Sequence, residues 1–166
     1  MENFIDYQPP EPDIWFMKQV YLTAERSKDP STKIGAVLVK DGNVIGSGYN
    51  GFARKVLDLP ERYNNRELKY RMVVHGEANS VLTCARMGIS TLGSILYSQG
   101  CPCENCMKSI IQAGVKEIVI HKQWKSSGRW DTTLSEMMIK ETGIKLRYLD
   151  KVLNMKGYSD GKIVDV

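Results

Sequence analysis

Two short segments of this 166-residue chain carry residue types that can bind and use a transition metal. The first is His75-Gly76-Glu77 and the second is Pro102-Cys103-Glu104-Asn105-Cys106. Each segment stands where we expect a helix to begin, and the free N–H groups and positive dipole of a helix N-terminus favour thiolates, the form of cysteine that binds metal. One histidine and two cysteines leave a fourth position open, which is typical of a catalytic zinc rather than a structural one.

The predicted zinc ligands are therefore His75, Cys103 and Cys106, with a bound water in the open position. Zinc lowers the pKa of its bound water toward about 7. Glu77 lies two residues after the histidine, where a carboxylate can take a proton from this water and pass it to a leaving nitrogen, as a general acid–base catalyst. His-x-Glu followed by Pro-Cys-x-x-Cys is the signature of zinc-dependent nucleobase deaminases. Either segment alone would be a weak signal, but together they predict hydrolytic deamination of a base.

The remaining histidine and cysteines have simpler interpretations. Cys84 lies on an apolar helix face and is expected in the core, Cys101 is expected to be structural, and His121 to be exposed or hydrogen-bonded. A closed Cys₃His site that uses Cys101 would instead indicate a structural zinc module that binds a partner or nucleic acid. A relative that binds a nucleotide without turning it over is a third possibility. Residues 1–74 contain neither cysteine nor histidine, so we expect one zinc ion.

Composition favours a single globular domain without membrane spans. Hydrophobic residues make up 42% of the chain and charged residues 25%, and no apolar run reaches the roughly 18 residues of a membrane helix. The net charge of +4 is a mild excess, so nucleic acid is not the expected partner, although the basic segment 54–71 is compatible with a grip on a triphosphate. The acidic, proline-rich start is neither a signal nor a transit peptide, which predicts a cytoplasmic protein.

The elements that must position these residues alternate along the chain. Residues 1–12 are expected to form a loose arm, 13–150 the deaminase domain and 151–166 a frayed tail. Within the domain, periodicity and turn signals predict helices over 13–26, 75–87, 103–113 and 131–142, strands over 34–39, 44–50, 95–97, 117–121 and 144–149, and a flap over 51–72. This order predicts an α/β fold in three layers, with a mixed sheet of about five strands covered by helices.

Over about residues 13–150 the chain resembles deoxycytidylate (dCMP) deaminases of the cytidine deaminase superfamily. Five segments carry the resemblance: residues 34–39 (IGAVLV) to the family's GAVIV strand, 48–51 (GYNG), 75–79 (HGEAN) to HAExNA, 96–106 (LYSQGCPCENC) to LYxTxxPCxxC, and 111–116 (IQAGVK) to IxxAGIK. The resemblance implies the cytidine-deaminase-like fold, one catalytic zinc ion and conversion of dCMP to dUMP and ammonia, a step that supplies precursor for dTTP.

The resemblance also implies roles for individual residues. Asn50 would hydrogen-bond the sugar hydroxyl, and the backbone around Gly76 and Glu77 would contact the pyrimidine carbonyl. Glu77 would protonate ring nitrogen N3 as water adds at C4. Lys33, just before the GAV strand, is the expected phosphate contact. Such deaminases are homo-oligomers, hexamers or dimers; Arg86 resembles an arginine near their subunit contacts, and Gly51 opens the stretch that forms a nucleotide effector site in regulated members.

Three departures from the family pattern bear on substrate and regulation. Gly76 replaces the usual alanine and leaves slightly more room. Residues 52–55 (FARK) replace the usual proline and glycine, so control by dCTP and dTTP does not follow from the resemblance. Cys101 at the expected pocket edge is compatible with a 5-substituted cytosine. The alternative substrates are thus dCTP, a 5-modified dCMP or a base in RNA, and an altered effector stretch is compatible with a phage-encoded protein acting in the host cytoplasm.

Overall fold

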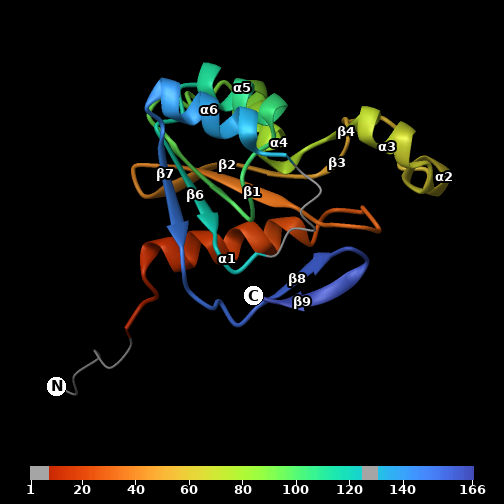
Figure 1. Cartoon of the computed structure of the whole chain (residues 1–166), viewed down its shortest axis with the longest axis horizontal. Coiled ribbons are helices and arrows are strands. Elements are labelled where there is room, and N and C mark those ends of the chain that lie inside the picture. The colour runs from red at the N-terminus through yellow and green to blue at the C-terminus, as the bar shows by residue number, and fades with distance from the viewer. Residues whose placement is uncertain (1–7, 125–130) are drawn as a thin grey trace.

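The computed structural model describes residues 8–124 and 131–166 of the chain. Its elements are α1 (Pro12–Ala24), β1 (Gly35–Lys40), β2 (Asn43–Tyr49), β3 (Gly51–Phe52), α2 (Pro60–Asn64), α3 (Arg66–Met72), β4 (Val73–Val74), α4 (Gly76–Met87), β5 (Ile95–Ser98), α5 (Glu104–Gln112), β6 (Glu117–His121), α6 (Thr133–Thr142), β7 (Lys145–Leu149), β8 (Lys156–Ser159) and β9 (Lys162–Asp165). The prediction of a mixed sheet between helical layers is confirmed (Figure 1).

A five-stranded sheet with the order β2-β1-β5-β6-β7 forms the middle layer. β1 pairs antiparallel with both β2 and β5, whereas β5, β6 and β7 run parallel. The β1–β2 hairpin turns at Asp41-Gly42, where both residues have positive φ, as a two-residue turn of this type requires. The parallel strands alternate with α5 and α6, which is the expected consequence of right-handed crossover connections.

Helices cover both faces of the sheet. α4, α5 and α6 lie on one face, and α1 lies on the other beside the β8–β9 hairpin (Figure 1). Alternating strand residues feed two separate cores: Val37 and Val119 pack toward α1, whereas Leu38 and Ile118 pack toward α4 and α5. The sheet therefore holds the first turns of α4 and α5, which carry the two predicted metal-binding segments, on the same face.

The predicted helix stops are confirmed, but the first helix begins and ends elsewhere than expected. Gly88 and Gly143 end α4 and α6 in the left-handed conformation. α1 begins at Pro12, with Glu11 as its N-cap residue, rather than with Asp13 as the cap. Proline is favoured at the first helical position, where its missing N–H has no helical partner to lose. The helix ends at Ala24 rather than at residue 26.

The expectation that residues 151–166 form a frayed tail is wrong. β8 and β9 form an antiparallel hairpin around Asp160-Gly161, and Leu153 and Val166 are buried in the core on the α1 side. Met155 and Val164 also pack against this core, whereas Val152 and Ile163 stay exposed. Of the N-terminal arm, residues 1–7 lie outside the described part of the chain, and residues 8–11 are exposed.

The flap over 51–72 contains more regular structure than its sequence indicated. β3 pairs with β4 at its base, and α2 and α3 project from the body of the molecule (Figure 1). The rings of Phe52 and Tyr63 stack with their centroids 4.4 Å apart, and Asn65 caps α3 by accepting the Leu68 N–H at 3.0 Å. None of the described helices is long and apolar enough to cross a membrane.

Candidate metal centre and active site

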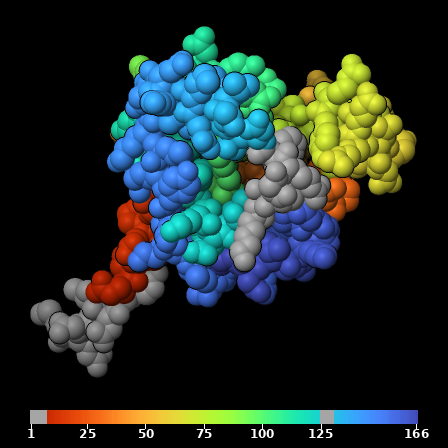
Figure 2. All heavy atoms as spheres, viewed as in Figure 1, coloured from red at the N-terminus to blue at the C-terminus, as the bar shows by residue number. Residues whose placement is uncertain are grey.

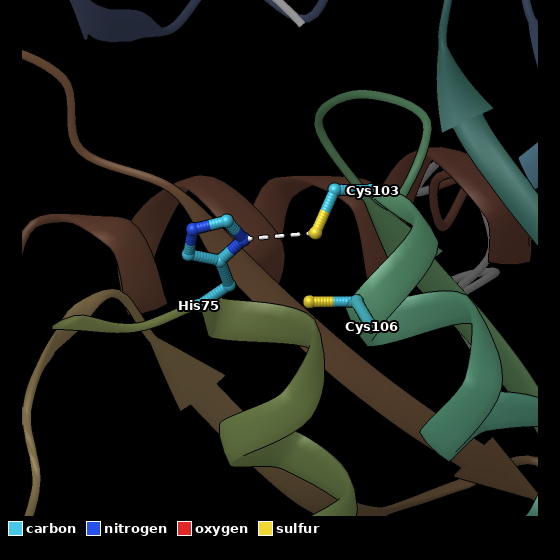
Figure 3. Close-up of side chains that lie close together, drawn as sticks. All are labelled: His75, Cys103 and Cys106. Carbon is cyan, nitrogen blue, oxygen red and sulfur yellow. Dashed lines mark hydrogen bonds between the residues drawn. The ribbon is translucent and has the colours of Figure 1, made fainter. Parts of the chain in front are cut away.

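His75, Cys103 and Cys106 come together at the adjoining N-termini of α4 and α5 (Figure 3). Their ligand atoms all lie within 4.8 Å of one another, and His75 Nδ1 is 3.4 Å from Cys103 Sγ. In tetrahedral zinc coordination, a histidine nitrogen and a cysteine sulfur lie about 3.6 Å apart. The three residues therefore fit a catalytic zinc site, and Cys101 does not join this cluster among the residues that the structure describes.

The pKa values of the two cysteine thiols shift in opposite directions. Cys106 Sγ–H and the His75 ring lower the pKa of Cys103, and the same contact with Cys103, together with burial, raises the pKa of Cys106. The hydrogen bond to Cys103 in turn raises the pKa of His75. Cys103 is thus the first thiolate of the set, and its position at the N-cap of α5 adds the favourable end of the helix dipole.

Glu77 lies in the first turn of α4 and is almost fully buried. Its carboxylate accepts a hydrogen bond from Ser98 Oγ at 3.4 Å and lies 4.0 Å from Cys106 Sγ, so it sits directly beside the metal-binding cluster. Burial raises the pKa of Glu77, although the neighbouring His75 opposes the shift. A carboxyl group with a raised pKa next to a metal site is suited to both accept and donate a proton.

Gly76 allows two backbone segments to approach the cluster closely. A Cβ atom at this position would lie 2.9 Å from the carbonyl oxygen of Ile34 and 3.3 Å from that of Gly48. An alanine would therefore require a backbone shift here. The strand pair β1–β2 is thus held tightly against the turn that carries His75 and Glu77.

A cavity of about 300 Å³ opens onto the cluster. His75, Glu77, Cys101 and Cys103 line its metal-binding end. Its remaining walls come from the loop after α1, from the flap and from the segments after β5 and β6; these residues include Asp29, Ser31, Ile34, Asn50, Lys69, Gln99, His121 and Trp124. The cavity has the size of a pocket for a small ligand.

Asn50 lines this cavity as expected, but its side chain also holds the adjacent loop. Its Oδ1 accepts the Ile34 N–H at 2.9 Å and its Nδ2 donates to the Thr32 carbonyl at 2.8 Å. Gln99, which sequence reasoning missed, does the same one residue further on: it accepts the Gly35 N–H at 2.6 Å and donates to the Lys33 carbonyl at 3.3 Å. No periodic pattern marks Gln99, because its role depends on a segment 64 residues away.

Lys33 does not line the cavity. Its ammonium group lies 5.7 Å from the centroid of the Tyr158 ring, on the opposite side of its loop. Lys69 of α3 lines the cavity instead: it is buried, 3.2 Å from Asp29 Oδ1 and 3.1 Å from Ser31 Oγ. From the sequence, Lys69 had no role apart from the other basic residues of 54–71, because the charge pattern of the flap does not reveal which lysine turns inward.

The simpler interpretations of Cys84 and His121 are confirmed. Cys84 is fully buried, and Trp124 packs in the core on the α1 side; Trp130 lies outside the described residues. His121 is buried and hydrogen-bonded, with Nδ1 2.7 Å from Tyr21 Oη and Nε2 2.8 Å from the Lys151 carbonyl. Burial lowers the pKa of His121, so the neutral form is favoured.

The two residues expected at subunit or effector contacts lie in different places: Arg86 is far along α4 from the metal cluster, whereas Gly51 pairs with Val74, next to His75. Arg86 is exposed in the last turn of α4, at the opposite end of that helix from His75. Gly51 is buried at the start of β3, where the flap leaves the body of the molecule.

Comparison with known proteins agrees with this geometry. The family described as "Cytidine and deoxycytidylate deaminase zinc-binding region" matches residues 10–122. Mouse deoxycytidylate deaminase is 35% identical over 139 residues, which cover 80% of this chain and 76% of the mouse protein.

Solved structures share the fold. The dCMP deaminase of cyanophage S-TIM5, solved in complex with dCMP and dUMP, superposes with a TM-score of 0.68 at 25% identity, over 86% of this chain and all of the phage protein. A structure from a study of tRNA:A34 deaminases has a TM-score of 0.53 at 20% identity, over 81% of this chain and 97% of that one, and shows the fold alone.

Proposed function

Because this chain belongs to the cytidine and deoxycytidylate deaminase zinc-binding family, we propose that it hydrolyses dCMP to dUMP and ammonia. The observation that carries the proposal is the buried Glu77 carboxylate beside the three zinc ligands, at the end of a cavity that can hold a small ligand. A structural zinc site would have no use for a buried carboxylate at this place. The relatives that share about a third of this sequence over most of its length support dCMP as the substrate.

Zinc bound by His75, Cys103 and Cys106 would act as a Lewis acid that lowers the pKa of water in the open position. Glu77 takes up the proton that this water loses and donates it to ring nitrogen N3 of cytosine. Once the water oxygen is bonded to C4, Glu77 takes the second proton from this new hydroxyl group and passes it to the amino group. The C4–N bond then breaks, and the amino group leaves as ammonia. Ser98 Oγ donates to the Glu77 carboxylate and so holds it in the orientation that both transfers need.

The rest of the nucleotide would extend along the cavity away from the metal cluster. Lys69 and Ser31 place an ammonium group and a hydroxyl within 3.1 Å of each other at the flap side of the cavity, and we assign the 5′-phosphate to them. The Lys69 ammonium group has three N–H donors, of which Asp29 and Ser31 take two, so one is left for a phosphate oxygen. Asn50 keeps one amide hydrogen and one lone pair beyond its two loop contacts, enough for a sugar hydroxyl.

The test is turnover of dCMP, 5-methyl-dCMP, dCTP and cytidine by the zinc-loaded protein, followed by ammonia release and by the ultraviolet change from cytosine to uracil. We expect dCMP to be the best substrate. A preference for 5-methyl-dCMP would instead indicate that the cavity wall at Cys101 accommodates a 5-substituent. A preference for dCTP would indicate that the flap binds a triphosphate. Absence of turnover on all four, with zinc bound, would refute a free-nucleotide deaminase and direct attention to RNA. Glu77→Gln is the control for adventitious activity.

A further inference from the structure

The C-terminal hairpin, β8–β9, contacts a loop that lines the cavity. We call residues 29–34, between α1 and β1, the substrate loop. Asp29, Ser31, Thr32 and Ile34 of this loop line the cavity, and so does Ser159 at the end of β8. The hairpin lies beyond residue 122, where the match to the deaminase family ends.

Four hydrogen bonds join the hairpin to the substrate loop. The Lys33 N–H donates to the Tyr158 carbonyl at 3.0 Å, and the Gly161 N–H donates to the Ser31 carbonyl at 2.8 Å. Tyr158 Oη donates to the Pro30 carbonyl at 3.2 Å, and the Asp160 N–H donates to Thr32 Oγ1 at 3.3 Å. Each of the four residues from Pro30 to Lys33 thus has one contact with the hairpin.

The hairpin is itself fixed to the core, so it can hold the loop in place. Gly157 packs so closely against Trp124 and Tyr21 that a Cβ atom there would lie 2.8 Å from the first ring and 3.2 Å from the second. At its base, the Val166 N–H donates to the Met155 carbonyl at 3.1 Å, and Val166 is buried. The Asp160-Gly161 turn has positive φ at both residues, as the two-residue connection demands.

The opposite side of the loop is held by the amides of Asn50 and Gln99. Between them, these amides and the hairpin bind the backbone from Pro30 to Gly35. None of the four hydrogen bonds between the hairpin and the substrate loop involves a metal ligand or Glu77.

We propose that the β8–β9 hairpin is a positioning element that sets the conformation of the substrate loop, and thereby substrate affinity rather than the rate of the chemical step. The proposal rests on the proposed function in taking the cavity as the nucleotide site. Its first consequence is kinetic: loosening the hairpin raises KM and leaves kcat nearly unchanged. Its second consequence needs no substrate, because the backbone amide of Lys33 loses its partner and exchanges its hydrogen faster.

The chain offers a matched pair of variants to test both consequences. Gly161→Pro removes the N–H that bonds to Ser31 and imposes a negative φ on a residue with φ of +74°. Gly42→Pro makes the same change in the Asp41-Gly42 turn of the β1–β2 hairpin, where φ is +75° and no atom lies near the missing Cβ. Tyr158→Phe is a milder variant that removes only the hydroxyl bond to Pro30.

With zinc-loaded full-length protein, we expect Gly161→Pro to raise KM for dCMP about tenfold and change kcat less than about twofold. Tyr158→Phe should raise KM about threefold. In hydrogen exchange followed by mass spectrometry, residues 30–35 should exchange about tenfold faster in Gly161→Pro than in the wild type or Gly42→Pro. Zinc content should be the same in all four proteins.

Unchanged exchange of residues 30–35 in Gly161→Pro and Tyr158→Phe would overturn the proposal, as would an equal rise of KM in Gly42→Pro. A fall of kcat with no change in KM would also contradict it. If Gly161→Pro fails to fold, Tyr158→Phe decides by the same measurements. If the wild type does not deaminate dCMP, the proposed function fails, and the exchange experiment alone still decides whether the hairpin holds the loop.

Discussion

At the scale of single residues, the proton affinity of the Glu77 carboxylate depends on its burial. Its pKa is raised chiefly because the carboxylate is removed from water. The folded protein therefore binds this proton more tightly than the unfolded chain does. It follows that the free energy of unfolding of the metal-free protein falls as the pH rises from the ordinary carboxyl pKa of 4.5 through the raised pKa of the folded state. The site thus gives up stability above that pH to keep a proton carrier next to the metal.

Glu77→Gln separates these two effects. The amide keeps the shape but carries no proton, so we expect kcat to fall by about 10²- to 10⁴-fold. In the metal-free protein, the same change should raise the melting temperature at pH 8 and have little effect at pH 4, where the carboxyl is neutral in both states. Calorimetry at the two pH values measures this. The control is Glu141→Gln, at an exposed site of α6, and a Glu77→Gln protein that melts below the wild type at pH 8 would contradict the argument.

The neighbouring cysteines distinguish an open metal site from a closed one. Cys103→Ser removes the thiolate that His75 and Cys106 stabilise, so zinc should fall from about one ion per chain to below about 0.1. Cys101→Ser is the matched control, because Cys101 lines the same cavity outside the ligand cluster and should retain its zinc. Metal analysis after dialysis gives the answer. Loss of zinc from Cys101→Ser would indicate a closed Cys₃His site.

At the scale of elements, the flap contributes a charged group to the cavity. α3 places Lys69 next to Asp29 of the substrate loop, and both side chains are less than 10% exposed. Removing one member of a buried ion pair leaves the other charge uncompensated. A test of phosphate binding must therefore neutralise both groups.

The double variant Lys69→Met/Asp29→Asn tests the assignment of the phosphate. We expect KM for dCMP to rise by about ten- to a hundredfold, because one charge-assisted hydrogen bond is lost, whereas turnover of deoxycytidine, which has no phosphate, should not change. Lys33→Met is the matched control, since that lysine faces Tyr158 and should leave KM unaltered. Steady-state kinetics on the two substrates measures the difference. If Lys33→Met raises KM and the double variant does not, the phosphate binds on the other side of the loop.

At the scale of the whole molecule, the outer face of α4 has the character of a contact surface. Leu82 is 54% exposed and Met87 is 58% exposed, and both lie near the exposed Arg86. Exposed apolar side chains around an arginine are typical of protein interfaces. We therefore propose that this face, which includes the arginine singled out in the sequence, joins subunits of a homo-oligomer.

Leu82→Glu should shift the protein toward monomer, because a charge would be buried at the contact. Light scattering after size-exclusion chromatography measures the mass. Leu22→Glu is the matched control: Leu22 is also 54% exposed, but it lies on α1, on the opposite face of the sheet. A wild-type protein that is already monomeric, or an equal effect of the two variants, would exclude α4 as the contact.

The surface view adds one feature at this scale. Figure 2 shows the flap as a separate lobe beside the compact body, so its attachment depends on few contacts. The contacts of Lys69 with Asp29 and Ser31 are among them, whereas the Phe52–Tyr63 stack lies within the flap. The flap is thus the part of the cavity wall that is least fixed by the two cores.

The order of the helices and strands in the three central layers and the identity of the metal-binding cluster were predictable from the sequence, because both depend on local patterns; the elements of the flap and the β8–β9 hairpin were not. The runs at 34–39 and 117–121 are apolar enough to be recognised as buried strands, and glycines at 88 and 143 mark helix ends by their conformational freedom. Cys-x-x-Cys at a helix start brings both sulfurs to one point whatever the rest of the fold. His75 joins the two cysteines as soon as its own helix begins on the same side of the sheet as theirs.

Only the tertiary structure decided which polar side chains face the cavity. Lys33 and Lys69 are equivalent in the sequence, but Lys33 pairs with Tyr158, 125 residues away, and Lys69 is turned inward by Asp29. Gln99 and the β8–β9 hairpin escaped prediction for the same reason, since each acts on a loop distant in the chain. The direction of a side chain in an irregular loop depends on which groups form hydrogen bonds with the loop's backbone. These groups are brought together only when the chain folds.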